Sequence, residues 1–216
     1  PTENSVTEER MFRVGQLHYT AAVPLDKIPI YRDMENTPYV QAPYLGTYYY
    51  LLNTNKEPLT DVRVRQALSL SIDRDMLTST VLQGTAFPAY SITPPDTLGY
   101  YPPRLFGFNP EKAQQLIAEA GYPDGENWPG IEIIYNTSEA HRKIAVAIQQ
   151  MWSSVLNIQV TLSNQEWKVY LDSVDQMEFD IARRGWIGDY VDPNNFLDLF
   201  ISEGGNNSTG YANAVY

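Results

Sequence analysis

The segment ARRGWIGDYVDPNNF, residues 182–196, carries residue types that could bind a charged ligand. Asp189 has Trp186 and Tyr190 close to it in the sequence, with Ile187 between them. A carboxylate binds a cationic group well where aromatic rings attract the cation and limit the access of water. These residues therefore predict a site for the positive end of a ligand, with Asp189 as the counter-ion.

The negative end of a ligand would need an arginine, a lysine or a protonated histidine, and Arg183 and His141 are the candidates. Successive side chains of a strand point to opposite faces, so only one of Arg183 and Arg184 can share a face with Asp189. A structural interpretation is also open, in which Trp186 belongs to the core and Asp189 caps the next helix. Residue chemistry alone does not decide between the two.

Several kinds of chemistry find no support in the sequence. The chain has no cysteine, and His18 and His141 lack the spacing of a metal-binding pair, so we expect no metal site and no thiol chemistry. No G-x-S-x-G nucleophile motif and no phosphate-binding glycine loop occurs, and we expect no cofactor. An enzyme that uses Asp189 as an acid or a base is kept as the alternative from a different class.

Charge and composition narrow the choice of partners. The net charge of −11 at pH 7 disfavours nucleic acid and anionic membrane surfaces, which this chain would repel. The 16 tyrosines and 4 tryptophans are typical of half-exposed surfaces that contact ligands or partners. A third hypothesis is therefore an interaction module, whose tyrosine-rich face docks a partner. No apolar run is long enough to span a membrane.

The elements that would position the candidate residues follow from capping signals and apolar periodicity. We expect main helices at residues 62–72, 109–122 and 138–157, and a short helix at 167–174. Residues 73–84 are expected either to continue the first helix or to begin a separate one. The clearest helix start is Asn109 followed by Pro110, because asparagine caps free amides and proline suits the first helical position. We expect strands at residues 47–53, 131–136, 158–163 and 179–186.

This order of elements predicts an α/β fold in which helices flank a mixed sheet. Asp189 then follows the last strand, where open α/β sheets commonly place ligand groups. The proline-rich segment Tyr90–Pro110 predicts a long, ordered surface loop. The chain begins and ends without a clear terminal element, so we expect residues 1–216 to be part of a longer protein.

Five segments of the chain resemble the family 5 solute-binding proteins, which deliver peptides to ABC transporters, and especially the oligopeptide-binding proteins. The first is GTYYYLLNTNKEPLTDVRVRQALSLSIDRD, and the last is ARRGWIGDYVDPNNFLDLF. AEAGYPDG, YNTSEAHRKIAVAIQQMW and VTLSNQEWKVYL lie between them in the family's order. The resemblance spans roughly residues 10–216. It implies one lobe of a two-lobe periplasmic-binding-protein fold, the second lobe of the complete chain, with the peptide enclosed between the lobes.

The resemblance also implies roles for the candidate residues. Asp189 matches the aspartate that pairs with the α-ammonium group of the peptide, and Trp186 matches a tryptophan that lines the site. Arg183 and His141 match cationic groups that meet the peptide carboxylate or its waters. The family pattern has a further arginine where this chain has Val174, so one carboxylate anchor is missing. The implied function is a non-enzymatic receptor that grips the peptide main chain with little side-chain selectivity.

The implied partners are an oligopeptide, the first lobe of the same protein and the membrane permease of an ABC transporter. The implied location is the periplasm, or the outside of a Gram-positive cell with a lipid anchor. Within the same class, the ligand could instead be a murein peptide, a dipeptide, a metal chelate or an oligosaccharide.

Overall fold

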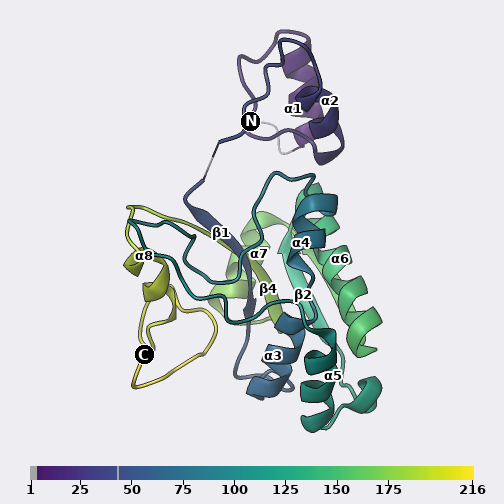
Figure 1. Cartoon of the computed structure of the whole chain (residues 1–216), viewed down its shortest axis with the longest axis vertical. Coiled ribbons are helices and arrows are strands. Elements are labelled where there is room, and N and C mark those ends of the chain that lie inside the picture. Colours follow the sequence, from purple (N-terminus) through teal and green to yellow (C-terminus); the bar gives the residue numbers. More distant parts are fainter. Residues whose placement is uncertain (1–3, 43) are drawn as a thin grey trace.

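The computed structural model describes residues 4–42 and 44–216, which form an α/β body with a small helical unit beside it (Figure 1). The N-terminal unit contains α1 (Ser5–Arg13), a 3-10 turn (Leu25–Lys27) and α2 (Ile28–Arg32). The carboxylate of the buried Glu9 holds this unit together. It accepts a hydrogen bond from the Tyr31 hydroxyl at 2.7 Å and pairs with Arg13 at 2.8 Å. These two helices were not among the predicted elements.

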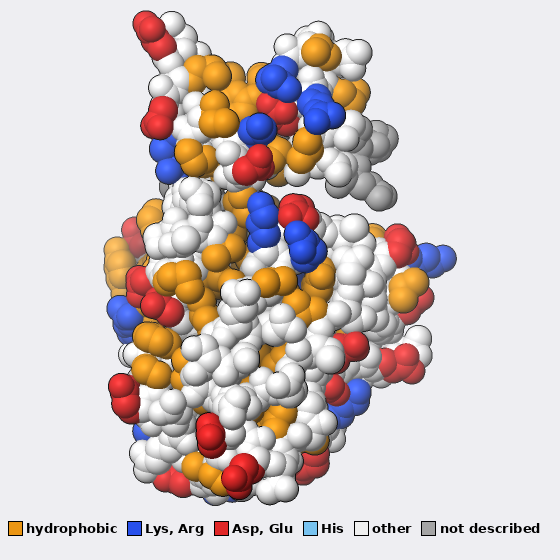
Figure 2. All heavy atoms as spheres, turned by 90° about the vertical axis from the view of Figure 1, so that its right-hand side faces the viewer, with side chains coloured by type: hydrophobic (Ala, Val, Ile, Leu, Met, Phe, Trp, Pro, Cys, Tyr) orange, Lys and Arg blue, Asp and Glu red, His pale blue; other side chains and the backbone are white. Residues whose placement is uncertain are grey.

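Polar contacts join the N-terminal unit to the body. Arg32 Nη2 donates to the Gln83 carbonyl at 2.9 Å, and Gln41 Nε2 donates to the Gly84 carbonyl at 3.0 Å. In Figure 2 the unit lies at the top of the molecule, above the larger body. The unit packs around its own buried residues, among them Ile28 and Tyr31.

Four strands form one mixed sheet in the described part of the body, in the order β1-β4-β2-β3. The strands are β1 (Gly46–Leu52), β2 (Ile131–Asn136), β3 (Val160–Gln165) and β4 (Ile181–Ile187). β4 is antiparallel to β1, and β2 is parallel to both β3 and β4. The predicted α/β fold with a mixed sheet is confirmed, and the predicted strand ends differ from these by two residues or fewer.

Helices cover both faces of the sheet. They are α3 (Val62–Leu70), α4 (Arg74–Met76) with a π-helical turn (Leu77–Val81), α5 (Pro110–Glu119), α6 (Glu139–Leu156), α7 (Trp167–Asp175) and α8 (Asn194–Leu197), with 3-10 turns at Pro123–Gly125 and Asp198–Phe200. The predicted caps are present: Asp61 accepts a hydrogen bond from Arg63 N at 2.8 Å, and Asn109 accepts one from Lys112 N at 2.9 Å. Residues 73–84, expected to continue the preceding helix or to begin a separate one, are separate from α3 and form the short α4 followed by the π-helical turn.

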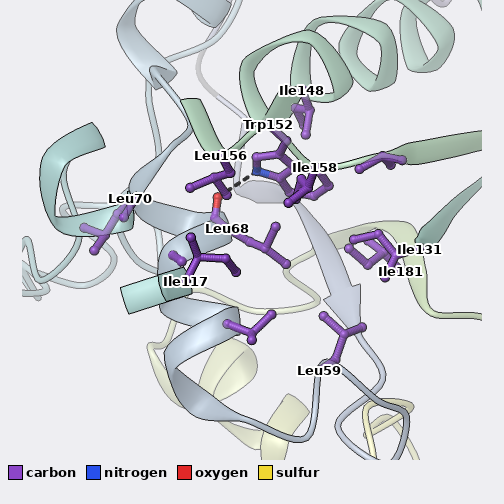
Figure 3. Packing of buried hydrophobic residues seen from close by; sticks show 14 of the residues in the cluster. Leu59, Leu68, Leu70, Ile117, Ile131, Ile148, Trp152, Leu156, Ile158 and Ile181 are labelled. Atoms are coloured by element: carbon purple, nitrogen blue, oxygen red, sulfur yellow. Dashed lines mark hydrogen bonds between the residues drawn. The ribbon is translucent and has the colours of Figure 1, made fainter. Parts of the chain in front are cut away.

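The core is split between the two faces because strand side chains alternate. Ile131, Ile133 and Ile181 pack with α3, α5 and α6 in the larger cluster, while Ile134 and Ala182 pack with α7 in the smaller one. In the larger cluster, the Trp152 indole donates to the Leu68 carbonyl at 2.9 Å and so ties α6 to α3 (Figure 3). The sheet that carries the candidate residues is thus fixed from both sides.

The proline-rich segment is an irregular loop between the π-helical turn and α5, as expected. The Tyr90 hydroxyl donates to Asp75 at 2.6 Å, and the Ile92 carbonyl accepts from the Thr47 hydroxyl at 2.8 Å. These bonds hold the loop against α4 and the start of β1.

We predict that Trp152→Phe lowers the free energy of unfolding by about 1–3 kcal/mol, because it removes a buried hydrogen bond and leaves unfilled volume. Trp152 is 3% exposed, whereas Trp167 is 52% exposed. Trp167→Phe is therefore the control, and it should change stability by about 0.5 kcal/mol or less. Chemical denaturation of both variants measures the difference. Equal losses in the two variants would contradict the packing role of Trp152.

Candidate ligand-binding site

Arg183 and His141 lie on one face of the sheet, next to Tyr48. Arg183 is in β4, opposite Tyr50 in the β1 ladder, and His141 is in the first turn of α6. The Arg183 guanidinium carbon lies 4.7 Å from the centre of the Tyr48 ring, and the Tyr48 hydroxyl lies 3.3 Å from His141 Nδ1. The fold thus brings together the two residues considered for the negative end of a ligand.

The guanidinium of Arg183 carries the charge of this cluster. Burial, with a smaller contribution from the Arg183 charge, lowers the pKa of His141 to about 4, so the ring is neutral at pH 7. From the sequence, a protonated His141 was a possible second cation. Desolvation disfavours the protonated ring, so Arg183 is the cation of this pair. Arg183 Nη1 donates to Asn136 Oδ1 at 3.4 Å, whereas Arg183 Nε is buried without an acceptor among the described residues.

Asp189 lies beyond the end of β4, in the exposed loop that leads to α8. Within residues 4–42 and 44–216, its carboxylate makes no hydrogen bond or ion pair to another side chain, and only its main-chain amide is held. Helix capping falls to Asp192, whose Oδ1 accepts from Asn194 N at 2.8 Å at the start of α8. The interpretation of Asp189 as a helix cap is therefore wrong.

Trp186 lies on the sheet face opposite to Arg183, because it pairs with Thr47 while Arg183 pairs with Tyr50. The Trp186 indole is half-buried and donates to Asn195 Oδ1 at 2.7 Å. The same oxygen accepts from the Asp189 amide at 3.4 Å. The fold therefore joins Trp186 to Asp189 through Asn195 of α8. It places Trp186 on the other side of the sheet from Arg183 and His141.

The remaining sequence candidates lie at the surface or in the core. Ile187 and Tyr190, on either side of Asp189, are 58% and 52% exposed. Val174, where the family pattern would have an arginine, is fully buried in α7 and packs in one cluster with Tyr170 and Phe179. That position supplies apolar contact to the core and no cation.

Sequence reasoning missed Tyr48 and Asn195. The aromatic run of β1 was visible, but its local pattern does not say that β4 is its neighbour, and only that pairing places Tyr48 beside Arg183. Asn195 was inside the segment that drew attention, but an asparagine that follows Asp-Pro reads as a turn former. Asn195 is only 5% exposed, and this burial, which distinguishes it from a turn residue, is not visible in the sequence.

Other features of the described residues do not coincide with these candidates. A largely apolar pocket of about 300 Å³ lies between β1 and the last residues of the chain, and it is lined by Tyr50, Leu51 and Leu52 of β1 and by Phe200, Tyr211 and Tyr216, among others. No group of three or more histidine or acidic side chains in residues 4–42 and 44–216 is arranged to hold a metal ion. In the same residues no helix combines the length and hydropathy needed to cross a membrane.

Comparison with known proteins places the chain in a family. Residues 1–208 match the family model of bacterial extracellular solute-binding proteins, family 5, middle region. The chain is 38% identical over 224 residues to the periplasmic oligopeptide-binding protein OppA of Salmonella typhimurium, covering all of this chain and 41% of that protein. It is also 38% identical over 224 residues to the periplasmic murein peptide-binding protein MppA of Escherichia coli, with the same coverage.

Solved structures agree with this match. The oligopeptide-binding protein OppAIV of Borrelia burgdorferi superposes with a TM-score of 0.92 at 39% identity, over all of this chain and 43% of that one. OppA of Haemophilus influenzae, solved with the peptide RPPGFSPFR, gives a TM-score of 0.89 at 36% identity, over 99% of this chain and 44% of that one. The chain therefore spans less than half of these relatives. It belongs to the bacterial extracellular solute-binding proteins of family 5.

Proposed function

We propose that this chain is the peptide-contacting lobe of the substrate-binding receptor of an oligopeptide ABC transporter. Relatives named as oligopeptide-binding and murein peptide-binding proteins match it over its full length, and one similar structure holds a peptide. Family 5 consists of solute-binding proteins, which favours binding without catalysis over the hydrolase alternative. The chain covers only 41% of these relatives. The ligand and partners of the whole protein are therefore proposed here together with the role of this chain.

The observation that carries the proposal is an incomplete ladder on β4. β1 pairs with β4 along its whole length, from Ile181 to Ile187. β2 pairs with β4 only at Ile181 and Ala182. In the described part of the chain, the main chain of residues 183–187 thus has a strand partner on one side only. An extended peptide can add to such an edge through main-chain hydrogen bonds, whatever its side chains are.

The orientation of the main-chain amides and carbonyls of β4 supports the addition of a peptide at this edge. The Gly188 amide donates to the Leu45 carbonyl on the β1 side, and the Arg183 carbonyl accepts from the Tyr170 hydroxyl. Main-chain groups of successive residues in an antiparallel strand point to opposite edges, so those of alternate residues point to the same edge. Gly185 and Ile187 therefore direct their amides and carbonyls away from β1, toward the edge that β2 leaves open. This role for Ile187 does not depend on its side chain.

Charged groups stand at the two ends of this free edge. Asp189, past one end, has a free carboxylate, and Arg183, at the other, has a buried Nε–H without an acceptor among the described residues. The positive charge of the Arg183 guanidinium is the group that an anionic end of a ligand would pair with. A peptide whose ammonium group meets Asp189 and whose carboxylate meets Arg183 satisfies both. The neutral His141 would then contribute a hydrogen bond.

Enclosure of the peptide would come from a second lobe of the same protein, with a membrane permease as the next partner. Relatives that are periplasmic support a location outside the cytoplasmic membrane, in the periplasm or at the cell surface. We propose the sheet body as the ligand-binding part of the lobe, because every candidate site residue lies in it.

A murein peptide receptor is the second candidate. The murein peptide-binding relative matches as well as the oligopeptide-binding ones, at 38% identity. Calorimetry with a murein tripeptide and with trialanine would separate the two, since the preferred ligand should bind at least tenfold more tightly, or about 1.4 kcal/mol.

We predict that the intact receptor binds trialanine and that N-acetylation of the peptide abolishes most of that binding. Acetylation removes the charge that Asp189 would pair with, and leaves the main-chain contacts of β4 in place. Calorimetry measures the affinities, and mass spectrometry of the recovered peptide tests for reaction. Cleaved peptide would support the hydrolase instead, and equal binding of both peptides would contradict the role of Asp189.

Asp189→Asn should weaken trialanine binding by about 2–5 kcal/mol, the range for removing one partner of a desolvated charge pair. Asp192→Asn, in the same loop, is the matched control. Asparagine keeps the oxygen that caps α8, so this variant should bind as the wild type does. Calorimetry of both variants checks the difference, and an unchanged affinity in Asp189→Asn would count against the proposed pair.

The lowered pKa of His141 predicts a pH response. Protonation would add a positive charge beside Arg183 and strengthen binding of a peptide carboxylate, but with a pKa of about 4 it occurs only in strong acid. The ratio of affinities for trialanine and its C-terminal amide should therefore stay constant between about pH 7.5 and pH 5.5. Calorimetry at both pH values measures this ratio. A several-fold rise at the lower pH would show that His141 titrates in its ordinary range.

A further inference from the structure

Asn195 occupies an unusual position next to the candidate site. It is in α8, is 5% exposed, and its Oδ1 accepts two hydrogen bonds. One comes from the Trp186 indole at 2.7 Å and the other from the Asp189 amide at 3.4 Å. One buried oxygen therefore joins a side chain of β4, the loop that carries the candidate carboxylate, and the helix that follows.

The chemistry of the two partners determines how the Asn195 amide is oriented. An indole N–H and a main-chain N–H can only donate, so the group that faces them must be the carbonyl oxygen. That oxygen has two lone pairs and can accept both bonds. Substitution by an aliphatic residue would leave two donors without an acceptor, at a cost of about 1–3 kcal/mol for each donor that stays buried.

A second contact restrains the same loop from the other side. The Gly188 amide donates to the Leu45 carbonyl at 2.9 Å. A Cβ at Gly188 would lie 2.8 Å from Leu45 Cδ2 and 3.4 Å from Phe196 Cε2, so the backbone passes closely between these two side chains. Phe196 is fully buried and follows Asn195 in α8. The backbone that leads to Asp189 is thus restrained by Leu45 on one side and by α8 on the other.

We propose that Asn195 is a positioning residue of the ligand site, which holds the Asp189 loop so that its carboxylate stands at the end of the free β4 edge. The inference rests on the proposed function, because it assigns Asp189 to the ammonium group of a peptide. Asn195 acts through Asp189 and Trp186 and need not touch the ligand. Its loss should therefore weaken recognition of the ammonium group specifically, and leave the main-chain contacts of β4 in place.

The test compares trialanine with N-acetyl-trialanine as ligands of the intact receptor. The ratio of their affinities reports the contribution of the ammonium group, and general damage to the fold would weaken both peptides together. Asn195→Ala should lower this ratio about tenfold, chiefly through weaker binding of trialanine. Asn195→Asp keeps an oxygen acceptor at the same place and should retain the ratio. Asn194→Ala, at the exposed neighbouring position, should also retain it.

If Asn195→Ala does not fold, Asn195→Ser replaces it, because the shorter hydroxyl side chain does not reach both donors. The indole N–H resonance of Trp186 adds a readout that needs no ligand. It should shift in Asn195→Ala and Asn195→Ser, remain close to its wild-type position in Asn195→Asp, and remain unchanged in Asn194→Ala.

The possible outcomes separate the two proposals. Wild-type protein that does not distinguish the two peptides would overturn the proposed function, and with it the role of Asn195 in ligand recognition. Wild-type discrimination that survives in Asn195→Ala would overturn the positioning role alone. Loss of discrimination in both Asn195→Ala and Asn194→Ala would also overturn it, since the effect would then belong to α8 as a whole.

Discussion

The pairing of β4 is the constraint on which the rest of the site depends. β1 satisfies one edge of β4 from Ile181 to Ile187, whereas β2 leaves it after Ala182. A central strand normally has partners on both sides, because main-chain donors and acceptors that lose water need replacements. Among the described residues, the second edge of β4 has no strand partner over residues 183–187, and the Tyr170 hydroxyl bonds only to its first carbonyl, that of Arg183. The candidate ligand residues lie in this segment or close to it. The pairing of β4 therefore determines where the candidate site is located.

The charged groups are then separated along this edge by the geometry of the strand. Arg183 points to the face covered by α6, where it meets Tyr48 and His141. Trp186 points to the other face, and Asp189 follows in the loop beyond. Burial keeps His141 neutral, so the positive end carries one charge. Under the proposed function, this separation of charges would distinguish the two ends of a peptide, and the main-chain edge would be indifferent to the side chains between them.

Local patterns predicted much of this fold. The caps at Asp61 and Asn109, the exact span of β2 and the buried stripe of α6 follow from short-range rules, because each depends on residues within a few turns of one another. The helices of the N-terminal unit were missed, since the buried Glu9 that organises them reads as a surface residue in sequence. The π-helical turn after α4 was also missed, because a continuous helix has the same pattern.

The amino-acid sequence by itself determined the α/β class, the residue types of the site and the family resemblance. Position after a strand was enough to single out Asp189. The tertiary structure decided which groups meet: that Tyr48 and His141 join Arg183, that Trp186 faces the other way, and that Asp192 caps α8 and leaves Asp189 free. It also decided that His141 is neutral at pH 7 and that Asn195 bonds to both Trp186 and the Asp189 amide. Strand order, burial and desolvation are properties of residues far apart in the chain, and no local pattern contains them.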